Sequence, residues 1–320
     1  MNMRFSKPFP DELAATHLYR NWALNDTSGT NTHTRAKFFA RATRSQRPND
    51  CPHPWSPLYL HQITAYLSEV TPQTYRANHT TLALTKNWGR IYDETPLKQS
   101  KVNVYEPDQF CKGSPASVYP LRLCNQCREE DLRSHVMTYW HREHQIAGID
   151  ICPKHGTALQ RFDWHSAYTS PNPVTLRGEV ASDLLVQANC HPILTRYREA
   201  AQAVLKSLTP VQYTYAHEQL LNRATKIGLC RRRLGHTGTS YLEHELPQYL
   251  YRELPRAWMA EHLDPDFLRD TFFPSATSED EYHSELKSLR YLGSTRPLYL
   301  LLALATVFES TEQIQNLLLN

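Results

Sequence analysis

The sequence predicts a mainly α-helical protein in which helix-turn-helix-like modules are joined by a small insert of the zinc-ribbon or zinc-finger type. Three observations predict this fold class. Apolar residues recur at helical spacing in parts of residues 11–84 and 180–319. Prolines and threonine-proline steps punctuate these segments. Between them, two residue pairs have metal-ligand spacing. We expect three domains, at residues 1–115, 116–165 and 166–320.

The first predicted helix covers residues 11–24. Asp11 and Glu12 fall in its first turn, where the helix dipole favours negative charge. Leu13 and Trp22 fall near helical spacing and form part of an apolar stripe. The pattern therefore predicts an amphipathic helix whose apolar face is core by default.

Two further helices are predicted at residues 58–70 and 71–84, and the second is capped by Thr71 and Pro72. Their tight connection is compatible with a helix-turn-helix. An ordinary helical hairpin with no role in DNA binding remains open from the pattern alone. Residues 86–119 show little periodicity and are predicted to connect this domain to the insert.

The insert carries the strongest chemical signal. Cys124 and Cys127 are separated by two residues, and Cys152 and His155 repeat that spacing after a further 24 residues. Three thiolates and one imidazole form a ligand set that tetrahedral Zn²⁺ takes in proteins. Gly156 then allows the backbone to turn tightly around the ion. We therefore expect one structural Zn²⁺ bound by these four side chains.

Other uses of these residues are less consistent with the pattern. The cysteines could instead be buried free thiols, with His155 a surface residue, but this interpretation does not explain why the spacing is repeated. A redox dithiol at Cys124 and Cys127 would leave Cys152 and His155 unexplained. A catalytic zinc ion needs an open coordination position, which four protein ligands do not leave.

Residues 121–123 are predicted to be a short strand or turn that leads into the first cysteine pair. A helix is predicted at residues 129–144, between the two ligand pairs. Trp140 is expected to be a core residue that packs against the zinc module. His141 and His144 lie near one helical turn from each other, but no further ligand pair accompanies them, so we expect no second metal site.

The C-terminal domain is predicted to be helical after a polar linker at residues 162–178. Its helices are expected at residues 180–188, 194–208, 215–229, 242–254, 257–268, 282–292, 296–308 and 311–319. The run at residues 298–304 is apolar on nearly every face, which predicts a buried central helix or an oligomer interface, with core the better interpretation.

The net charge is +3 and the pI is about 8.4. This balance permits local contact with nucleic acid, whereas compact DNA-binding domains tend to have a pI above about 9. The most basic segment carries Lys226, Arg231, Arg232 and Arg233, beside a glycine-containing loop at residues 235–239. We predict that these side chains contact phosphates, and a solvated charged surface is the alternative.

The seven cysteines are too sparse for a secreted disulfide framework. Outside the ligand set, Cys51, Cys111, Cys190 and Cys230 are expected to be reduced and partly buried. The N-terminal residues lack an apolar signal segment, and the apolar run at residues 298–305 is too short to span a bilayer. We expect a soluble cytoplasmic protein with no membrane partner.

The residues around the metal ligands resemble a known family. The motif runs Tyr139-Trp140-His141-Arg142-x-His144-Gln145, followed by Cys152-Pro153-Lys154-His155-Gly156-x-x-Leu159. It resembles the TniQ/TnsD family, bacterial target-selection proteins of cut-and-paste DNA transposons. The start Pro8-x-Pro10-Asp11-Glu12-Leu13 is similar to the family's N-terminus. The resemblance is specific at residues 8–24 and 121–159 and diffuse over residues 166–320.

This resemblance implies an adaptor in transposition. Such an adaptor recognises target DNA or an RNA-guided Cascade ribonucleoprotein and recruits an AAA+ ATPase of the TnsC type. The partner-binding surface would then include Asp11, Glu12 and Trp22 together with the zinc module. The C-terminal domain, with its closing helix-turn-helix-like hairpin, would engage the target or a second copy of the chain as a homodimer. Direct recognition of an attachment site, as in TnsD-type relatives, is the alternative within this class.

An enzyme is the alternative from another class, for example a zinc-dependent hydrolase or nuclease. The sequence has no H-E-x-x-H motif, no G-x-S-x-G motif and no clustered carboxylates at metal-ligand spacing. Its 10 glycines include no phosphate-binding loop. We therefore expect no catalytic activity of this chain.

Overall fold

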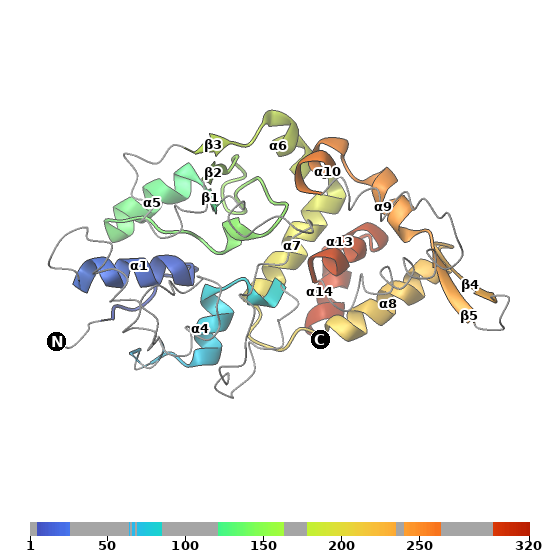
Figure 1. Ribbon diagram of the computed structural model, residues 1–320, viewed down its shortest axis with the longest axis horizontal. Coiled ribbons are helices and arrows are strands. Elements are labelled where there is room, and N and C mark those ends of the chain that lie inside the picture. The colour runs from blue at the N-terminus through green and yellow to red at the C-terminus, as the bar shows by residue number, and fades with distance from the viewer. Residues whose placement is uncertain are drawn as a thin grey trace, which may run out of the picture. The chain divides into compact units, whose positions relative to one another are not determined.

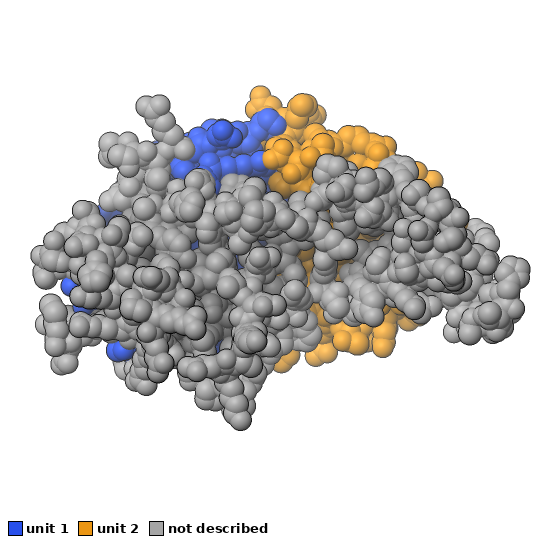
Figure 2. Space-filling model, in the orientation of Figure 1, with its two compact units in different colours: residues 1–83, 87–107, 114–182 blue, residues 84–86, 108–113, 183–320 orange. Residues whose placement is uncertain are grey.

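The computed structural model describes residues 5–25, 64, 66–67, 69–84, 121–162, 178–234, 240–263 and 297–320. Helices predominate among these residues, as predicted (Figure 1). The chain divides into two compact units (Figure 2). Unit 1 comprises residues 1–83, 87–107 and 114–182, and unit 2 comprises residues 84–86, 108–113 and 183–320. The N-terminal residues and the cysteine-containing insert fall in one unit. The three expected domains stay a prediction.

The first part of the chain contains short helices and one small sheet. Its elements are α1 (Ala14–Asn25), α4 (Pro72–His79), the 3-10 helix η1 (Leu82–Leu84), β1 (Leu121–Leu123), α5 (Asn125–His135), the 3-10 helix η4 (Glu143–Gln145), β2 (Gln160–Phe162) and β3 (Glu179–Val180). The strands form an antiparallel sheet in the order β1-β2-β3. Leu121 pairs with Phe162, and Gln160 pairs with both Leu123 and Val180. The strand predicted at residues 121–123 is confirmed.

One glycine of this unit is required by close packing. A Cβ atom at Gly178 would lie 2.6 Å from the Phe162 ring. Real Cβ atoms do not approach other atoms so closely, so only glycine leaves room for this aromatic side chain. Phe162 in turn packs edge-on against Trp140, with ring centroids 5.4 Å apart. Trp140 is fully buried, which confirms its predicted place in the core.

Helix α1 begins three residues later than predicted. Asp11 has a φ of 58°, in the left-handed region, and therefore cannot begin a right-handed helix. Glu12 instead forms an isolated antiparallel bridge with His141. The amide of Leu13 donates to the Trp140 carbonyl, with the two atoms 2.8 Å apart. The acidic residues predicted for the first helical turn therefore lie in an extended segment before α1.

Helix α4 confirms the predicted cap and is shorter than predicted. Thr71 adopts an extended conformation, and its hydroxyl accepts from the Thr74 amide at 3.1 Å, followed by Pro72 in the first turn. The helix ends at His79 because Thr80 returns to the extended region. Of the helix predicted at residues 58–70, residue 64 is helical, residues 66–67 and 69–70 are turn and coil, and the others lie outside the described residues.

Helix α5 begins four residues earlier and ends nine residues earlier than the helix predicted at residues 129–144. It begins at Asn125, directly after the first metal-ligand cysteine, and ends at His135. Val136 ends it with a φ of 62°, while its amide donates to the Leu132 carbonyl. The following residues are mainly extended up to η4, because they pair with the N-terminal segment through His141.

The second unit is a helical domain with one β-hairpin. Its elements are α6 (Asp183–Asn189), α7 (Pro192–Lys206), α8 (Tyr213–Lys226), β4 (Cys230–Leu234), β5 (Ser240–His244), α9 (Leu246–Glu253), α10 (Arg256–His262), α13 (Pro297–Val307) and α14 (Thr311–Leu319). Every residue of α13 is buried, and this helix contacts α7, α8 and α9 (Figure 1). The prediction that residues 298–304 form a central core helix is confirmed.

Helices α13 and α14 form the predicted closing hairpin. The three residues 308–310 connect them, and Ser310 caps α14 by accepting from the Gln313 amide at 3.2 Å. Helix α14 packs on α7 and α8 through buried Ile314 and Leu318. The hairpin is therefore built into the core of its unit through both helices.

The arginine-rich segment is a strand. Residues 230–234 pair antiparallel with residues 240–244, with Arg231 opposite Glu243 and Arg233 opposite Tyr241. The helix predicted at residues 242–254 is correspondingly divided into the end of β5 and the helix α9. Pairing between the strands satisfies the backbone groups there, and short-range periodicity does not report such pairing.

Candidate metal centre

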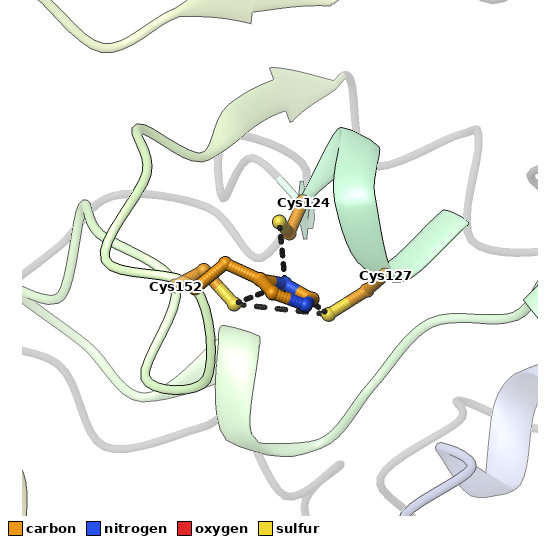
Figure 3. Close-up of side chains that lie close together, drawn as sticks. Cys124, Cys127 and Cys152 are labelled. Atoms are coloured by element: carbon orange, nitrogen blue, oxygen red, sulfur yellow. Dashed lines mark hydrogen bonds between the residues drawn. The ribbon is translucent and has the colours of Figure 1, made fainter. Parts of the chain in front are cut away.

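The first ligand pair is positioned by the transition from strand to helix. Cys124 follows β1 in an extended conformation, and its carbonyl accepts from the Arg128 amide at 3.0 Å. Cys127 lies in the first turn of α5. The sulfur atoms of both residues point toward the sulfur atom of Cys152 (Figure 3). Because Cys124 precedes α5 and Cys127 lies in its first turn, both thiols face the same side, toward the second ligand pair.

The second ligand pair lies in a tight turn. The amide of Gly156 donates to the Cys152 carbonyl at 2.8 Å, and the amide of Cys152 donates to the Thr157 carbonyl at 2.7 Å. An isolated bridge between Ile151 and Ala158 closes this turn. Gly156 has a φ of 67°, so the predicted need for glycine is confirmed as a backbone requirement. The turn brings His155 back toward the sulfur atom of Cys152.

The ligand atoms of Cys124, Cys127, Cys152 and His155 all lie within 4.8 Å of one another. His155 Nδ1 lies 3.5, 3.4 and 3.6 Å from the sulfur atoms of Cys124, Cys127 and Cys152. The sulfur atoms of Cys127 and Cys152 are 3.7 Å apart. In a tetrahedron with Zn–S bonds of about 2.3 Å and a Zn–N bond of about 2.0 Å, two sulfur atoms lie about 3.8 Å apart, and each sulfur lies about 3.6 Å from the nitrogen.

The distances therefore fit one tetrahedral metal ion, and these four side chains could hold it. The three cysteines are buried, and the side chain of His155 is 14% exposed. Four protein ligands complete a tetrahedron, so an ion bound there would have no open position for substrate or water. The chemistry of this donor set is that of a structural metal site.

A carboxylate supports the imidazole ligand. Glu130 Oε1 lies 3.2 Å from His155 Nε2, the ring nitrogen that faces away from the sulfur atoms. Glu130 also pairs with Lys154, which lies between the two ligands of the second pair. A carboxylate bonded to the far nitrogen of a ligating histidine orients the ring and fixes its tautomer. Sequence reasoning missed Glu130, whose only local signal is its place one helical turn after Cys127.

The three thiol groups are hydrogen-bonded to one another. Hydrogen bonds from the thiols of Cys127 and Cys152 lower the pKa of the Cys124 thiol. The pKa of the Cys127 thiol is raised by the same hydrogen bonding, because donating to a neighbouring sulfur stabilises its protonated form.

A further histidine lies beside the cluster. His144, on η4, is 2% exposed, and its Nε2 lies 3.5 Å from the sulfur of Cys152 and 3.7 Å from that of Cys127. Burial lowers the pKa of His144 to about 3. His141 stands next to it, with ring centroids 4.9 Å apart, and its Nε2 pairs with Asp131 at 2.9 Å. Sequence reasoning noted both histidines and missed this proximity, which only the path of residues 136–146 creates.

The N-terminal segment is bound directly to the metal module. Arg142 Nε donates to Asp11 Oδ1 at 2.9 Å, and the Glu143 amide donates to Asp11 Oδ2 at 3.0 Å. The Arg142 amide also donates to the Asp11 carbonyl at 2.9 Å. Burial raises the pKa of Asp11, and the Arg142 charge opposes that shift. Asp11, predicted to contact a partner, thus has its carboxylate engaged within unit 1.

Glu12 is also engaged inside the protein. Its side chain is fully buried, and one carboxylate oxygen accepts from Arg20 Nη2 at 2.7 Å. Burial raises the pKa of Glu12, and Arg20 acts against this shift. Glu12, predicted to contact a partner, thus has its carboxylate engaged within unit 1, and that role stays a prediction. Trp22 lies on α1, and its side chain falls outside the described residues.

The predicted nucleic-acid residues lie in unit 2. Lys226 is exposed at the end of α8, two residues before Gly228, which has a φ of 79°. Arg231, Arg232 and Arg233 lie on β4, and their side chains fall outside the described residues. The structure therefore places the four residues on a helix end and the strand that follows it.

The remaining cysteines differ in their surroundings. Cys190 is exposed, in contrast to the expected partial burial, because it lies in the turn between α6 and α7. Cys51, Cys111 and the side chain of Cys230 lie outside the described residues. None of the described helices combines the length and the apolar character needed to cross a membrane.

Comparison with known proteins identifies one family. Residues 3–159 match the model of the TniQ family. The match includes the N-terminal segment, α1, α4 and all four residues of the metal cluster. A comparison of the sequence with curated proteins finds no match.

Proposed function

We propose a specific role for this chain, which belongs to the TniQ family and is thus a transposition-associated protein. In this role it is a target-selection adaptor. It would bind target DNA or an RNA-guided Cascade ribonucleoprotein and recruit an AAA+ ATPase of the TnsC type to that target.

The observation that carries the proposal is the construction of unit 1. The N-terminal segment is hydrogen-bonded along residues 139–143, directly beside a closed metal cluster. Three interactions hold the N-terminal segment and residues 139–143 in one conformation, and the surface that they form is therefore preorganised. These interactions are the proposed metal ligation, the Asp11–Arg142 pair and the buried Glu12–Arg20 pair. A preorganised surface loses little conformational entropy on binding, which suits a protein that connects two others.

We propose Zn²⁺ as the ion of this cluster, with one ion per chain and a structural role. The donor set of three sulfur atoms and one nitrogen suits zinc, and the interatomic distances agree with tetrahedral ligation. The ion would cross-link the start of α5 to the turn around Cys152. Without it, three buried thiols would lie within 4.8 Å of one another and of the His155 imidazole with no ion to bind them together.

The charge of the closing hairpin favours the adaptor over direct reading of DNA by this element. In a DNA-binding helix-turn-helix the first residues of the second helix face the bases. The corresponding first turn of α14 exposes Glu312 and Gln313, and α14 contains no lysine or arginine. A carboxylate there repels phosphates, and phosphate contacts supply most of the affinity for DNA.

Direct recognition of attachment-site DNA, as in a TnsD-type protein, is the second candidate. It is favoured by exposed Lys226 at the end of α8 and by the three consecutive arginines on β4. A two-stranded ribbon is one of the elements that proteins place in a DNA groove. A zinc-dependent hydrolase or nuclease has no support from the metal cluster, because its four ligands leave no open position.

Binding assays separate these candidates. Purified chain is tested for binding to the ATPase, to Cascade and to attachment-site DNA, the last by gel shift over a series of salt concentrations. The adaptor proposal predicts binding to the ATPase that survives the triple substitution Arg231→Ala, Arg232→Ala and Arg233→Ala. Arg252→Ala, on the exposed surface of α9, is the matched control.

DNA binding that weakens steeply with salt and disappears in the triple variant would support the TnsD-type role. If the chain binds the DNA in this way and binds neither the ATPase nor Cascade, the adaptor proposal is wrong.

A further inference from the structure

We propose that His144 is a positioning residue of the metal centre, which donates a hydrogen bond from Nε2 to the thiolates of Cys127 and Cys152 without binding the ion. The inference rests on the metal centre proposed above and assigns a role to a residue outside its four ligands.

The distances place His144 at hydrogen-bonding range of two sulfur atoms. Its Nε2 lies 3.5 Å from the sulfur of Cys152 and 3.7 Å from that of Cys127. Both distances lie within the 4.0 Å range of N–H···S contacts. The side chain is almost fully buried, so water does not compete for this interaction.

The surroundings of the ring select one tautomer. A neutral imidazole carries a single N–H group. In His144 the other nitrogen, Nδ1, is buried with no hydrogen-bond partner among the described residues. A proton on Nδ1 would therefore gain no acceptor and would leave the Nε2 lone pair facing two sulfur atoms. A proton on Nε2 gains both thiolates as acceptors once metal binding has removed their protons.

The charge of the cluster gives this donor a purpose. Three thiolates and one divalent cation leave a formal charge of about −1 in a buried site. A buried charge is costly unless hydrogen bonds stabilise it. The backbone amide of Cys127 donates to the sulfur of Cys124, and that of His155 donates to the sulfur of Cys152.

The sulfur of Cys127 has a side-chain donor beside it, whereas the sulfur atoms of Cys124 and Cys152 accept from backbone amides. The amides of Arg128, Cys152 and Gly156 donate to carbonyl oxygens instead. Thr157 Oγ1 lies 3.4 Å from the sulfur of Cys124, so that thiolate has a second donor. Among the described residues, His144 is a side chain outside the ligand set that reaches Cys127.

The distances also distinguish His144 from the four ligand residues. His155 Nδ1 lies within 3.6 Å of all three sulfur atoms and completes the four-atom cluster. His144 approaches two of the sulfur atoms and is not part of that cluster. It therefore borders one edge of the tetrahedron, as expected of a hydrogen-bond donor to bound thiolates.

The test uses the full chain loaded with Co²⁺, whose absorption spectrum reports both coordination geometry and thiolate bonding. His144→Leu removes the donor and keeps an apolar side chain, His144→Gln retains an N–H donor, and His135→Leu is the control. His135 stacks on Phe9 at a centroid distance of 4.2 Å and is not part of the four-residue cluster found among the described residues. Zn²⁺ affinity is measured in parallel by competition with a chromophoric chelator.

We expect every variant to bind one ion with a tetrahedral Co²⁺ spectrum. In His144→Leu the affinity for Zn²⁺ should fall by about 10- to 100-fold, the range typical of lost outer-shell partners. The sulfur-to-cobalt charge-transfer band should move to lower energy, because unbonded thiolates donate more charge. His144→Gln should recover part of both effects, and His135→Leu should match the wild type.

Two results would overturn the proposal. An unchanged affinity and charge-transfer band in His144→Leu would show that the donor has no influence. Loss of the tetrahedral spectrum in that variant would show that His144 is a ligand. Failure of the wild type to bind one ion would instead contradict the metal centre itself.

A measurement on the wild type avoids dependence on variant folding. With ¹¹³Cd²⁺ bound, the Hε2 proton of His144 should show scalar coupling to cadmium through the sulfur of Cys127 or Cys152. A His144 ring protonated at Nδ1 would also contradict the proposal.

Discussion

Arg142 Nε lies 2.9 Å from Asp11 Oδ1, and the two residues are 131 positions apart in the sequence. The pair connects the extended segment before α1 to the residues that lead from α5 into the metal cluster. The Arg142 side chain is 5% exposed. It also donates a hydrogen bond to the carbonyl of Ala77, which lies in α4. One guanidinium therefore fixes three separate parts of unit 1.

Replacing this guanidinium should destabilise unit 1. Arg142→Met removes one partner of a largely buried pair and leaves the Asp11 carboxylate without its counterion. We expect a loss of about 3 kcal/mol in the free energy of unfolding, measured by urea titration. Lys154→Ala, in an exposed pair with Glu130, is the control and should have a much smaller effect. Equal losses in the two variants would contradict the assigned role of Arg142.

Metal removal should unfold the insert. We expect elemental analysis of the purified chain to find about one Zn per chain. Cys152→Ser should lose the metal and lower the melting temperature of unit 1, because metal-binding energy contributes to folding. Cys190→Ser changes an exposed cysteine outside the cluster and should keep metal content and melting temperature unchanged. A stable, metal-loaded Cys152→Ser protein would contradict the ligand assignment.

Val136→Gly should stabilise the protein. Val136 is 84% exposed and has a φ of 62°, a conformation that is costly for a side chain branched at Cβ. Glycine adopts it without this cost and commonly ends helices. We expect a gain of about 0.5–1 kcal/mol in unfolding free energy. Val136→Ala retains a Cβ atom and should gain less, so an equal gain in both variants would exclude strain at this position as the cause.

Unit 1 should lose stability in acid through two buried histidines. Burial lowers the pKa of His17 to about 3 and that of His79 to about 4, from the ordinary histidine value of 6.5. Between pH 6.5 and 4 the unfolded chain therefore binds more protons at these sites, and stability falls as the pH falls. Glu12 acts in the opposite direction, because burial raises its pKa and its contribution is lost as the pH rises.

The contribution of one histidine can be isolated by substitution. His79→Asn should reduce the slope of unfolding free energy against pH in the window from 6.5 to 4, as measured by urea unfolding at successive pH values. Val136→Ala, which changes no titratable group, serves as the reference for the slope. An unchanged slope in His79→Asn would show that His79 is not held neutral by burial.

Features that depend on neighbouring residues were predictable from the sequence. The spacing of Cys124, Cys127, Cys152 and His155 predicts a metal cluster because short turns leave such pairs few conformations. The Thr71 cap and the apolar helix α13 follow from equally local rules. The end of α5 at Val136 was not predictable, because valine gives no local signal for a left-handed residue.

Local patterns in the sequence predict the Cys₃His cluster, the helical C-terminal part and the motifs of the TniQ family. Contacts between distant segments place Asp11 and Glu12 in internal pairs, His144 beside the cluster and the arginines of residues 231–233 on a strand. The two groups of features differ in the sequence separation of the residues that interact. Ligand spacing and helix periodicity act within a few residues, whereas ion pairs, strand pairing and burial depend on segments that meet only in the folded protein.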